Sequence, residues 1–481
     1  MLPTITVDVG TTSVKLCLFD AHGDLQASAR DTTPTTTDSL GEIYQVDILQ
    51  DLIRTFILAL PPEVRGTVKR IAITGVGESG GLVRPDGSLA SPMILWHDHR
   101  GADLLTGLSG SARELVYRVT GLPVNANYGL SKVAWAVKNG AGDEAEAKWL
   151  NVSEYLAAWM TGERWSEYSL ASRTMALDLQ RRAWSAEVAA LLGLSVEIFP
   201  ELQPATHGSP ITRSVADRFG VPANVHVHVA GHDHMVGAIG ADLHHGELLN
   251  STGTTEGLLF SHDAPSLDDA SAMAMLANGI SCIGSDFTLF ASIPTGGSAF
   301  ATLQSMLGLP ITELNLILED LHHRYLAGDI VLENIPLVLP QFRGSPPPTK
   351  RAAARGMIAG LQTDVAVDDI VFGCFLGMVV QFRDVLELFP MQPDRIKVIG
   401  PASKNPLWLQ LKADLLGTPL SVSQFPEVVS RGAQALASET RSDWDGCKPF
   451  EVLPDETRHG ALAHWYADVR PLWEHMKAAP V

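Results

Sequence analysis

The chain has 481 residues, of which 46% are hydrophobic and 19% charged, and its formal net charge is −19. This length exceeds one ordinary core and predicts two domains, and the apolar content argues against a long disordered region. The acidic excess disfavours nucleic acid and anionic membranes as partners, although a phosphate site built locally from backbone N–H groups is compatible with it.

The cysteine spacing and the hydropathy of the chain bear on three further classes of protein: metal-binding, secreted and membrane proteins. The four cysteines stand far apart without a paired C-x-x-C spacing, so they indicate neither a zinc site nor a disulfide framework. The chain starts without the basic and apolar segments of a signal peptide, and its longest apolar run, residues 370–380, is too short to span a bilayer. We therefore expect a cytoplasmic protein with no membrane partner.

The first elements predicted along the chain form a β-hairpin. Ile5, Val7 and Val9 share one face of a strand, and a second alternating strand follows a bend at Gly10-Thr11-Thr12. Another turn leads into a third strand. Asp8 lies on the strand face opposite Val7 and Val9.

Strands and helices are then expected up to residue 240. Alternating apolar stretches predict strands at residues 70–77, 93–100 and 224–231, and most of residues 129–160 and 172–195 are expected to be helical. Gly231 ends the last of these strands, and the small residues after it predict the start of a helix.

The opening pattern returns in the second half. Residues 246–260 again give a strand, a Gly253-Thr254-Thr255 bend and a second strand, 243 positions after the first bend. Helices are expected at residues 298–307, 366–388 and 406–416, and a strand at 395–400. This repeat of one pattern at a distance of 243 residues predicts two similar α/β domains, joined near residues 240–247, with a cleft between them.

The repeated bend has the composition of a phosphate site. A Gly-Thr-Thr bend directs backbone N–H groups and two hydroxyls into one concavity, which suits phosphate oxygens. Asp8 precedes the first glycine by two residues and is placed to bind a metal, whereas Ser251 occupies the corresponding position in the second copy. One Mg²⁺ needs few protein carboxylates, so a single acid suffices. A turn-capping role for Asp8 is the alternative.

The two bends, with Asp8 in the first, resemble the phosphate motifs of the actin, chaperone and hexokinase ATPase fold. Residues 73–103, 230–241 and 398–420 resemble the first sugar-binding, catalytic and adenosine segments of the FGGY carbohydrate kinase family. The resemblance covers nearly the whole chain. It implies an α/β fold of two ribonuclease-H-like, actin-like ATPase domains flanking a central cleft, with residues 1–243 for the sugar and 244–481 mainly for the nucleotide.

By this resemblance Asp233 is the catalytic base, which takes the proton from the sugar hydroxyl as that hydroxyl attacks the γ-phosphate. Its position between a strand and a helix is where open α/β sheets bind ligands, and is also that of a helix N-cap. His232 and His234 flank it and are expected to pack or to line the sugar pocket, with a zinc site as the alternative.

Trp96, Asp98 and Arg100 are spaced to point to one side of an extended stretch, and an aromatic face beside an acid and a guanidinium suits a polyol. The resemblance implies that Trp96 and Asp98 contact substrate while Arg100 braces Asp98; a surface ion pair is the alternative. Glu78 stands where many relatives carry Gln or Arg, which leaves the sugar open. The expected substrate-binding residues are Glu78, Ser79, Gly80, Trp96, Asp98, Arg100, Asp233 and His234.

For ATP and Mg²⁺ the resemblance implies Asp8 as the metal residue and the loop from Gly400 to Asn405 as the adenosine site, although a βα loop before Pro406 is ordinary by itself. Pro401 and Leu376 depart from the family pattern, in which a glycine and a glutamate are usual. The expected ATP-binding residues are Gly10, Thr11, Thr12, Ser13, Lys15, Gly253, Thr254, Thr255, Gly296, Gly297, Gly400, Ser403, Lys404 and Asn405.

We therefore expect an ATP-dependent carbohydrate kinase that phosphorylates a hydroxyl of a small sugar, with a ketopentose such as xylulose as the favoured acceptor. Deoxyketoses, hexuloses, sugar acids and smaller polyols stay open, as do an actin- or chaperone-like ATPase and a nucleotide-binding pseudoenzyme. The expected partners are the sugar and ATP, and a homodimer is compatible with the resemblance.

Overall fold

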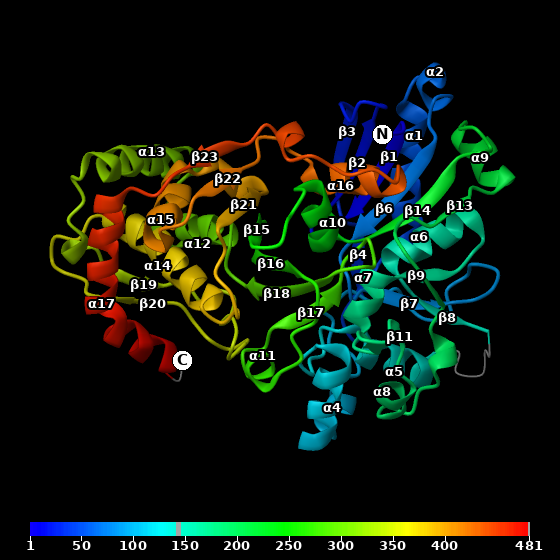
Figure 1. Ribbon diagram of the computed structural model, residues 1–481, viewed down its shortest axis with the longest axis horizontal. Coiled ribbons are helices and arrows are strands. Elements are labelled where there is room, and N and C mark those ends of the chain that lie inside the picture. The colour runs from blue at the N-terminus through cyan, green and yellow to red at the C-terminus, as the bar shows by residue number, and fades with distance from the viewer. Residues whose placement is uncertain (141–145, 480–481) are drawn as a thin grey trace.

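The computed structural model describes residues 1–140 and 146–479, which form two lobes, each built on a mixed sheet (Figure 1). The first sheet has the order β13-β14-β6-β1-β2-β3 and the second β17-β18-β16-β15-β21-β22-β23. The strands of the first are β1 (Thr4–Val9), β2 (Ser13–Phe19), β3 (Leu25–Thr32), β6 (Arg70–Gly75), β13 (Gly208–Pro210) and β14 (His226–His232). Those of the second are β15 (Glu247–Thr252), β16 (Glu256–His262), β17 (Ala277–Ile280), β18 (Phe287–Ile293), β21 (Arg395–Ile399), β22 (Leu420–Val422) and β23 (Phe450–Val452).

The two sheets share one topology. β1 pairs antiparallel with β2 and parallel with β6, and β15 pairs in the same way with β16 and β21. Beyond them, β14 and β13 correspond to β22 and β23, first parallel and then antiparallel. β3 corresponds to β18, and β17 is an additional edge strand. The repeated Gly-Thr-Thr phrase therefore belongs to a repeat of the whole sheet.

Both hairpins turn at the predicted bends. The last pair before the first bend is Val9 with Val14, and Gly10 N–H donates to the Ser13 carbonyl (3.1 Å). In the second hairpin Gly253 N–H donates to the Thr255 carbonyl (2.9 Å). The predicted alternation is confirmed, because Val7 and Val9 are buried in one core while Asp8 lies on the opposite face.

Helices form three layers around the two sheets. α1, α6 and α9 pack on the outer face of the first sheet, whereas α10 and α16 lie on its other face; α16 packs on the first sheet and α10 contacts strands of both sheets. α14 and α15 cover the outer face of the second sheet, and α12, α13 and α17 pack outside them. The bounds are α1 (Val46–Ala59), α6 (Val152–Thr161), α9 (Arg213–Phe219), α10 (Asp233–Gly240), α12 (Ser298–Leu307), α13 (Ile311–Ala327), α14 (Val367–Leu386), α15 (Pro406–Leu416), α16 (Val428–Ala437) and α17 (Glu456–Ala478).

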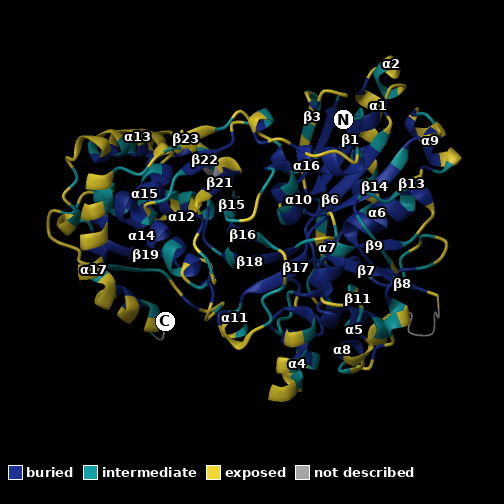
Figure 2. Cartoon of the chain, in the orientation of Figure 1, coloured by how far each residue is buried: buried dark blue, intermediate teal, exposed yellow. Residues whose placement is uncertain are grey.

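Figure 2 shows that buried residues concentrate on the sheets and on the helices between them, whereas the outer faces of α13 and α17 are exposed. Smaller elements extend the first lobe beside β7 and α5. The remaining elements are α2 (Pro62–Arg65), α3 (Ala102–Thr106), α4 (Gly110–Thr120), α5 (Gly129–Asn139), α7 (Tyr168–Ala171), α8 (Ala186–Ala190), α11 (Asp269–Met273), β4 (Thr35–Thr37), β5 (Glu42–Tyr44), β7 (Gly80–Val83), β8 (Lys148–Asn151), β9 (Trp165–Glu167), β10 (Leu177–Asp178), β11 (Ala183–Trp184), β12 (Glu201–Gln203), β19 (Leu337–Leu339) and β20 (Met357–Ala359).

Two predicted elements are wrong. Residues 93–100 do not form a strand: Ile94 makes isolated bridges, and Asp98 N–H donates to the Leu95 carbonyl (3.1 Å) in a turn. Residues 172–195 contain only short elements, because Met175 and Arg182 adopt positive φ (61° and 51°), which a helix does not tolerate.

The other predicted elements are largely confirmed. Residues 129–160 contain α5, β8 and most of α6, and the part at 141–145 lies outside the described residues. All four cysteines are buried free thiols. Within the described part of the chain, no helix combines the length and apolar character that crossing a bilayer requires.

Candidate active site

Asp233 is the first residue of α10 and directly follows β14. Its strand carries a bulge between Val229 and Gly231, and Gly231 has a φ of 119°. A Cβ there would lie 2.4 Å from Ser169 Oγ, so only glycine fits, and the bulge fixes the direction in which Asp233 is presented. Asp233 Oδ1 accepts the N–H of His234 (2.6 Å) and lies 3.3 Å from Nδ1 of His232.

The electrostatics of Asp233 are those of a base that titrates near neutral pH. Burial raises the pKa of its carboxyl to about 8, and the negative charges of Asp8 and Glu78 add to the shift, although 23% of the side chain is exposed. Asp8 is 5% exposed, and its charge is offset by Lys15, whose Nζ lies 3.6 Å from Asp8 Oδ2. Neighbouring carboxylates such as Asp8 and Asp233 suit a hard divalent cation.

No group of three or more His, Cys, Asp or Glu side chains is arranged to hold a metal by itself within residues 1–140 and 146–479. Mg²⁺ does not require such a group, since it keeps waters and takes phosphate oxygens as ligands.

Burial and the charge of Arg173 lower the pKa of His232 well below its usual range and that of His234 to about 4, so both imidazoles are neutral at pH 7. His234 Nδ1 is 2.9 Å from Ser251 Oγ.

Glu78 is held by Arg173, which the sequence did not single out. Arg173 Nε donates to Glu78 Oε1 (2.8 Å), and Glu78 Oε2 is 3.9 Å from Nε2 of His232. Glu78 adopts a positive φ of 64°, a strained conformation for a residue with a side chain. The Arg173 guanidinium also lies over the rings of Tyr128 (5.1 Å) and Phe290 (5.8 Å). No local pattern marks this set, because its members come from five distant segments of the chain.

The extended stretch predicted to carry Trp96, Asp98 and Arg100 is wrong, because a turn precedes Asp98. Trp96 Nε1 donates to Thr11 Oγ1 (3.0 Å), which connects this segment to the first bend. Asp98 is buried, and both of its oxygens accept from Arg100, the nearest at 2.6 Å. Bracing of Asp98 by Arg100 is therefore confirmed, and Asp38 binds the other end of the guanidinium.

Ser79 and Gly80 support the same segment. Ser79 Oγ accepts the N–H of Trp96 (2.9 Å), and the Gly80 and Ile94 backbones exchange hydrogen bonds of 2.9 and 2.8 Å. A Cβ on Gly80 would lie 2.6 Å from the Leu150 carbonyl oxygen, so the close approach of β8 requires glycine there.

The first bend is linked to the second half of the chain through Lys15. Gly10, Thr11 and Ser13 are half-buried, and Thr12 is exposed. Lys15 Nζ lies between Asp8 and Glu427 Oε2 (3.3 Å), and Glu427 immediately precedes α16. Glu427 was not predicted, since 412 residues separate it from Lys15.

The glycines assigned to ATP gather at the second bend, whose Gly253 and Thr254 are exposed. The N–H groups of Gly296 and Gly297 donate to Thr254 (3.1 Å) and Gly253 (2.8 Å), so they hold the bend. Gly400 has a φ of 98°, and a Cβ there would lie 2.1 Å from the Thr252 carbonyl oxygen. All three glycines are therefore required by close packing against the bend.

The loop after Gly400 leads into α15. Ser403 Oγ donates to the Gly400 carbonyl (2.7 Å), and Lys404 is exposed. Asn405 Oδ1 accepts the N–H of Trp408 (3.2 Å), so this residue is the N-cap of α15. Leu376 is buried in the apolar core of α14 and α15, which explains a leucine at that position.

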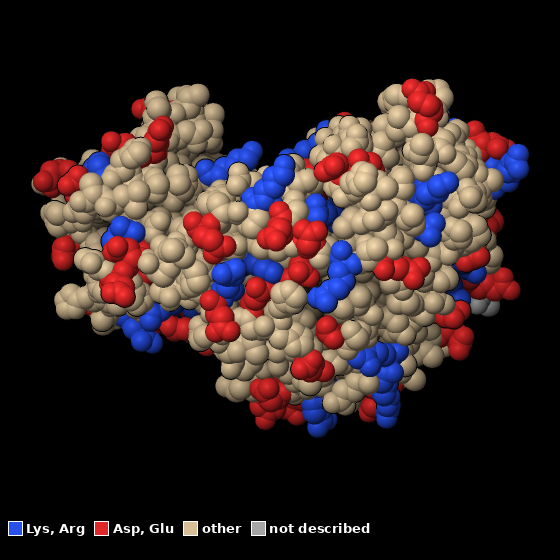
Figure 3. All heavy atoms as spheres, turned by 45° about the horizontal axis from the view of Figure 1, so that its top comes forward, with Lys and Arg blue, Asp and Glu red and all other residues tan. Residues whose placement is uncertain are grey.

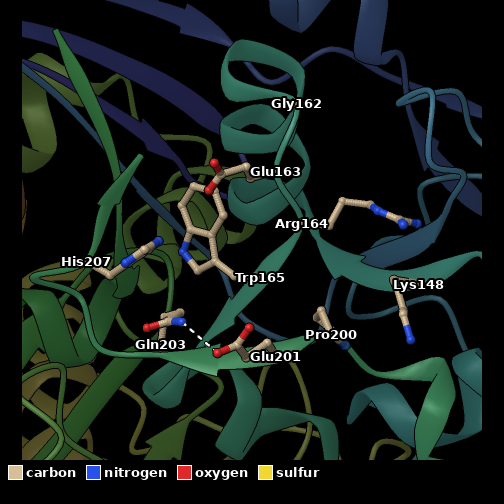
Figure 4. A pocket seen from close by; sticks show the side chains of 9 residues that line it. All are labelled: Lys148, Gly162, Glu163, Arg164, Trp165, Pro200, Glu201, Gln203 and His207. Atoms are coloured by element: carbon tan, nitrogen blue, oxygen red, sulfur yellow. Dashed lines mark hydrogen bonds between the residues drawn. The ribbon is translucent and has the colours of Figure 1, made fainter. Parts of the chain in front are cut away.

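Figure 3 shows a notch between the two lobes, with acidic and basic side chains gathered along its floor. A different pocket lies on the first lobe, at β9 and β12 (Figure 4), where the ring of Trp165 meets that of His207 edge-on at 5.2 Å. Its other lining residues are Lys148, Gly162, Glu163, Arg164, Pro200, Glu201 and Gln203. None of these lining residues belongs to the candidate active site around Asp233.

Comparisons with known proteins find relatives that match this chain over nearly its whole length. The chain is 26% identical over 479 residues to a glycerol kinase of Pseudomonas syringae pv. syringae, covering 95% of this chain and 90% of that protein. Its fold matches a xylulose kinase from Lactobacillus acidophilus (TM-score 0.87, 19% identity, 100% and 99% of the chains). It also matches a Plasmodium falciparum glycerol kinase solved with ADP (0.84, 19%, 98% of each).

The family assignment follows from models of two domains. Residues 4–240 match the N-terminal domain of the FGGY family of carbohydrate kinases, and residues 248–439 match its C-terminal domain. The fold has the actin-like ATPase architecture of the solved FGGY structures. The chain therefore belongs to the FGGY family of carbohydrate kinases, ATP-dependent phosphotransferases with an alcohol group as acceptor.

Proposed function

We propose that this kinase phosphorylates a hydroxyl of a small sugar beside Asp233, and that Asp233 accepts the proton of that hydroxyl. The placement of Asp233 carries the proposal: a bulge fixes it at the start of α10, and burial raises the pKa of its carboxyl to about 8. A base whose pKa lies near the working pH combines sufficient ionisation with sufficient basicity.

We assign the two bends to the phosphates of ATP and Asp8 to Mg²⁺. Thr12 and Thr254 are exposed residues of the two bends and would offer their backbone N–H groups to phosphate oxygens, whereas the N–H of Gly253 already donates to the Thr255 carbonyl; Lys15 adds a positive charge beside the first bend. When bound, Mg²⁺ supplies neutralisation of the charge that develops on the transferred phosphoryl group. Asp8 and Lys15 would orient the phosphates, and closure of the lobes would exclude water.

The proposed acceptor is a ketopentose such as xylulose. Solved structures of similar fold include xylulose, gluconate and glycerol kinases, so the fold alone leaves several acceptors open. Residues 1–243 would form the sugar domain and 244–481 the nucleotide domain. A homodimer stays a prediction.

A coupled ADP-release assay with Mg-ATP over ketopentoses, hexuloses, sugar acids and polyols tests the proposal. One sugar should stimulate ADP release, and Asp233→Ala should lower kcat by about 10²–10⁴-fold while ATP and sugar still bind. Asp217→Ala, an exposed residue of α9, is the control and should behave as wild type. Near-normal turnover of Asp233→Ala would reject the base, and ATP hydrolysis independent of any sugar would favour the ATPase alternative.

A further inference from the structure

Arg173 has hydrogen-bonding capacity that the protein does not use. Its side chain is buried with 5% of the residue exposed, and Nη1 has no hydrogen-bond partner within the described residues. Buried polar groups are nearly always paired, so an unpaired guanidinium N–H needs an explanation. Arg173 pairs with Glu78, and Glu78 also lies close to His232, the residue before Asp233.

The surroundings of Arg173 fix its orientation. Nε is committed to Glu78, and the rings of Tyr128 and Phe290 cover the guanidinium. Gly77 makes room for it, since a Cβ there would lie 3.1 Å from Arg173 Cγ and 2.4 Å from a ring carbon of His232. Phe290 belongs to the second sheet and also contacts His234, so residues of both lobes surround the Arg173 guanidinium.

The unpaired Nη1 of Arg173 can donate hydrogen bonds but cannot accept them. A guanidinium carries no acceptor, so it matches an oxygen that has no proton of its own, such as a ketone or carboxylate oxygen. A hydroxyl at the same place would also need an acceptor for its proton; the Phe290 ring offers none, and the hydroxyl of Tyr128 is the only acceptor that the two rings carry. Lys350 adds a second positive charge nearby: burial and the charge of Arg173 lower its pKa to about 8.

We propose that Arg173 determines acceptor specificity by donating from Nη1 to an oxygen on an oxidised carbon, which makes the acceptor a ketose or a sugar acid rather than a plain polyol. This inference rests on the proposed function. The competing role is purely structural, in which Arg173 only orients Glu78.

The experiment uses the full chain and matched acceptor sets of equal carbon number: xylulose, xylonate and xylitol, then fructose, gluconate and sorbitol, then dihydroxyacetone, glycerate and glycerol. Wild type should prefer the ketose or the acid to the polyol by at least about tenfold in kcat/KM. Arg173→Lys should lower kcat/KM for the preferred acceptor by about 10–100-fold, mainly through KM, and should lower kcat/KM for the polyol by a clearly smaller factor, with the KM for ATP unchanged.

Arg431→Lys is the matched control, because Arg431 is also buried and paired with a carboxylate, at Asp443 (3.2 Å), but lies outside the site. Arg173→Gln, checked for folding by thermal melting, provides a second variant. An equal loss for all three members of a set, or a wild type that prefers the polyol, overturns the inference. A wild type that phosphorylates no acceptor overturns the proposed function instead.

Discussion

Nδ1 of His234 lies 2.9 Å from Oγ of Ser251, so the residue beside the candidate base touches the position at which the two Gly-Thr-Thr copies differ. Ser251 corresponds to Asp8 in the repeated sheet. A second acid at this point would add a negative charge beside His234, the residue after Asp233, and the pKa of the Asp233 carboxyl is already raised. A serine in the second copy therefore avoids a further charge near the proposed base.

Ser251→Asp should lower kcat at pH 7, because another carboxylate raises the pKa of Asp233, and each pKa unit reduces the ionised fraction about tenfold. Activity should recover as pH is increased. Ser251→Asn, similar in size and uncharged, is the control. Equal losses in the two variants at every pH would contradict a charge effect.

The hydrogen bond from Trp96 to Thr11 should couple sugar and phosphate binding. Trp96→Phe and Thr11→Val each remove it, so the double variant should lose about 1 kcal/mol less than the sum of the single losses, measured from kcat/KM. Trp96→Phe combined with Thr67→Val, an exposed site, should be additive. Strict additivity in the first pair would show that the hydrogen bond does not matter.

A buried ion pair supports the second bend. Lys412 Nζ contacts Glu256, the residue after the bend, and donates to Asn250 Oδ1 (2.7 Å). Lys412→Met leaves the Glu256 carboxyl buried without its partner and should cost about 3–5 kcal/mol of unfolding free energy. It should also raise the KM for ATP. Lys412→Met with Glu256→Leu should recover stability in urea titrations; a single variant as stable as wild type would refute the account.

Two buried carboxyls behind β14 predict a pH-dependent stability. Burial raises the pKa of Glu154 to about 7 and that of Glu167 to about 8. The folded state therefore holds protons that the unfolded state releases above its ordinary glutamate pKa of 4.5, so this contribution to stability is full below pH 4.5 and falls as the pH rises from there to 7–8.

The stability advantage of wild type over Glu167→Gln should accordingly shrink between pH 5.5 and 8.5, by about 1.4 kcal/mol for each pH unit over which the proton is retained. Urea midpoints at the two pH values measure it. Glu163→Gln, at an exposed site, should show no such change. An advantage that grows with pH would reverse the sign and reject the assignment.

Sequence patterns predicted the parts of the fold that depend on local alternation. The hairpins at Gly10 and Gly253 and the strand before Asp233 follow from side chains that alternate between a core and an opposite face. The pairing of Arg100 with Asp98 was predicted because the two residues are only two positions apart. Local spacing carries such information since it fixes both the element and its neighbours.

The missed features depend on partners distant in the sequence. Residues 93–100 look like a strand, but the ion pair of Arg100 with Asp38, 62 residues earlier, stabilises a different conformation. Arg173 is positioned by its contacts with Glu78, Tyr128 and Phe290, which are distant in the sequence. Lys15 pairs with Glu427, which lies in the other half of the chain. Charge pairs of this kind leave no periodic signal.

The packing of α16 on β1 and β6 affects the order in which the protein can be made. The Arg70 side chain of β6 donates to the Ala437 carbonyl (3.1 Å), yet residues 428–437 emerge from the ribosome long after the first sheet. Until then the face of that sheet beneath α16 is uncovered, and exposed apolar surface of this kind promotes aggregation. A chain terminated before Val428 should therefore aggregate rather than accumulate as a folded lobe.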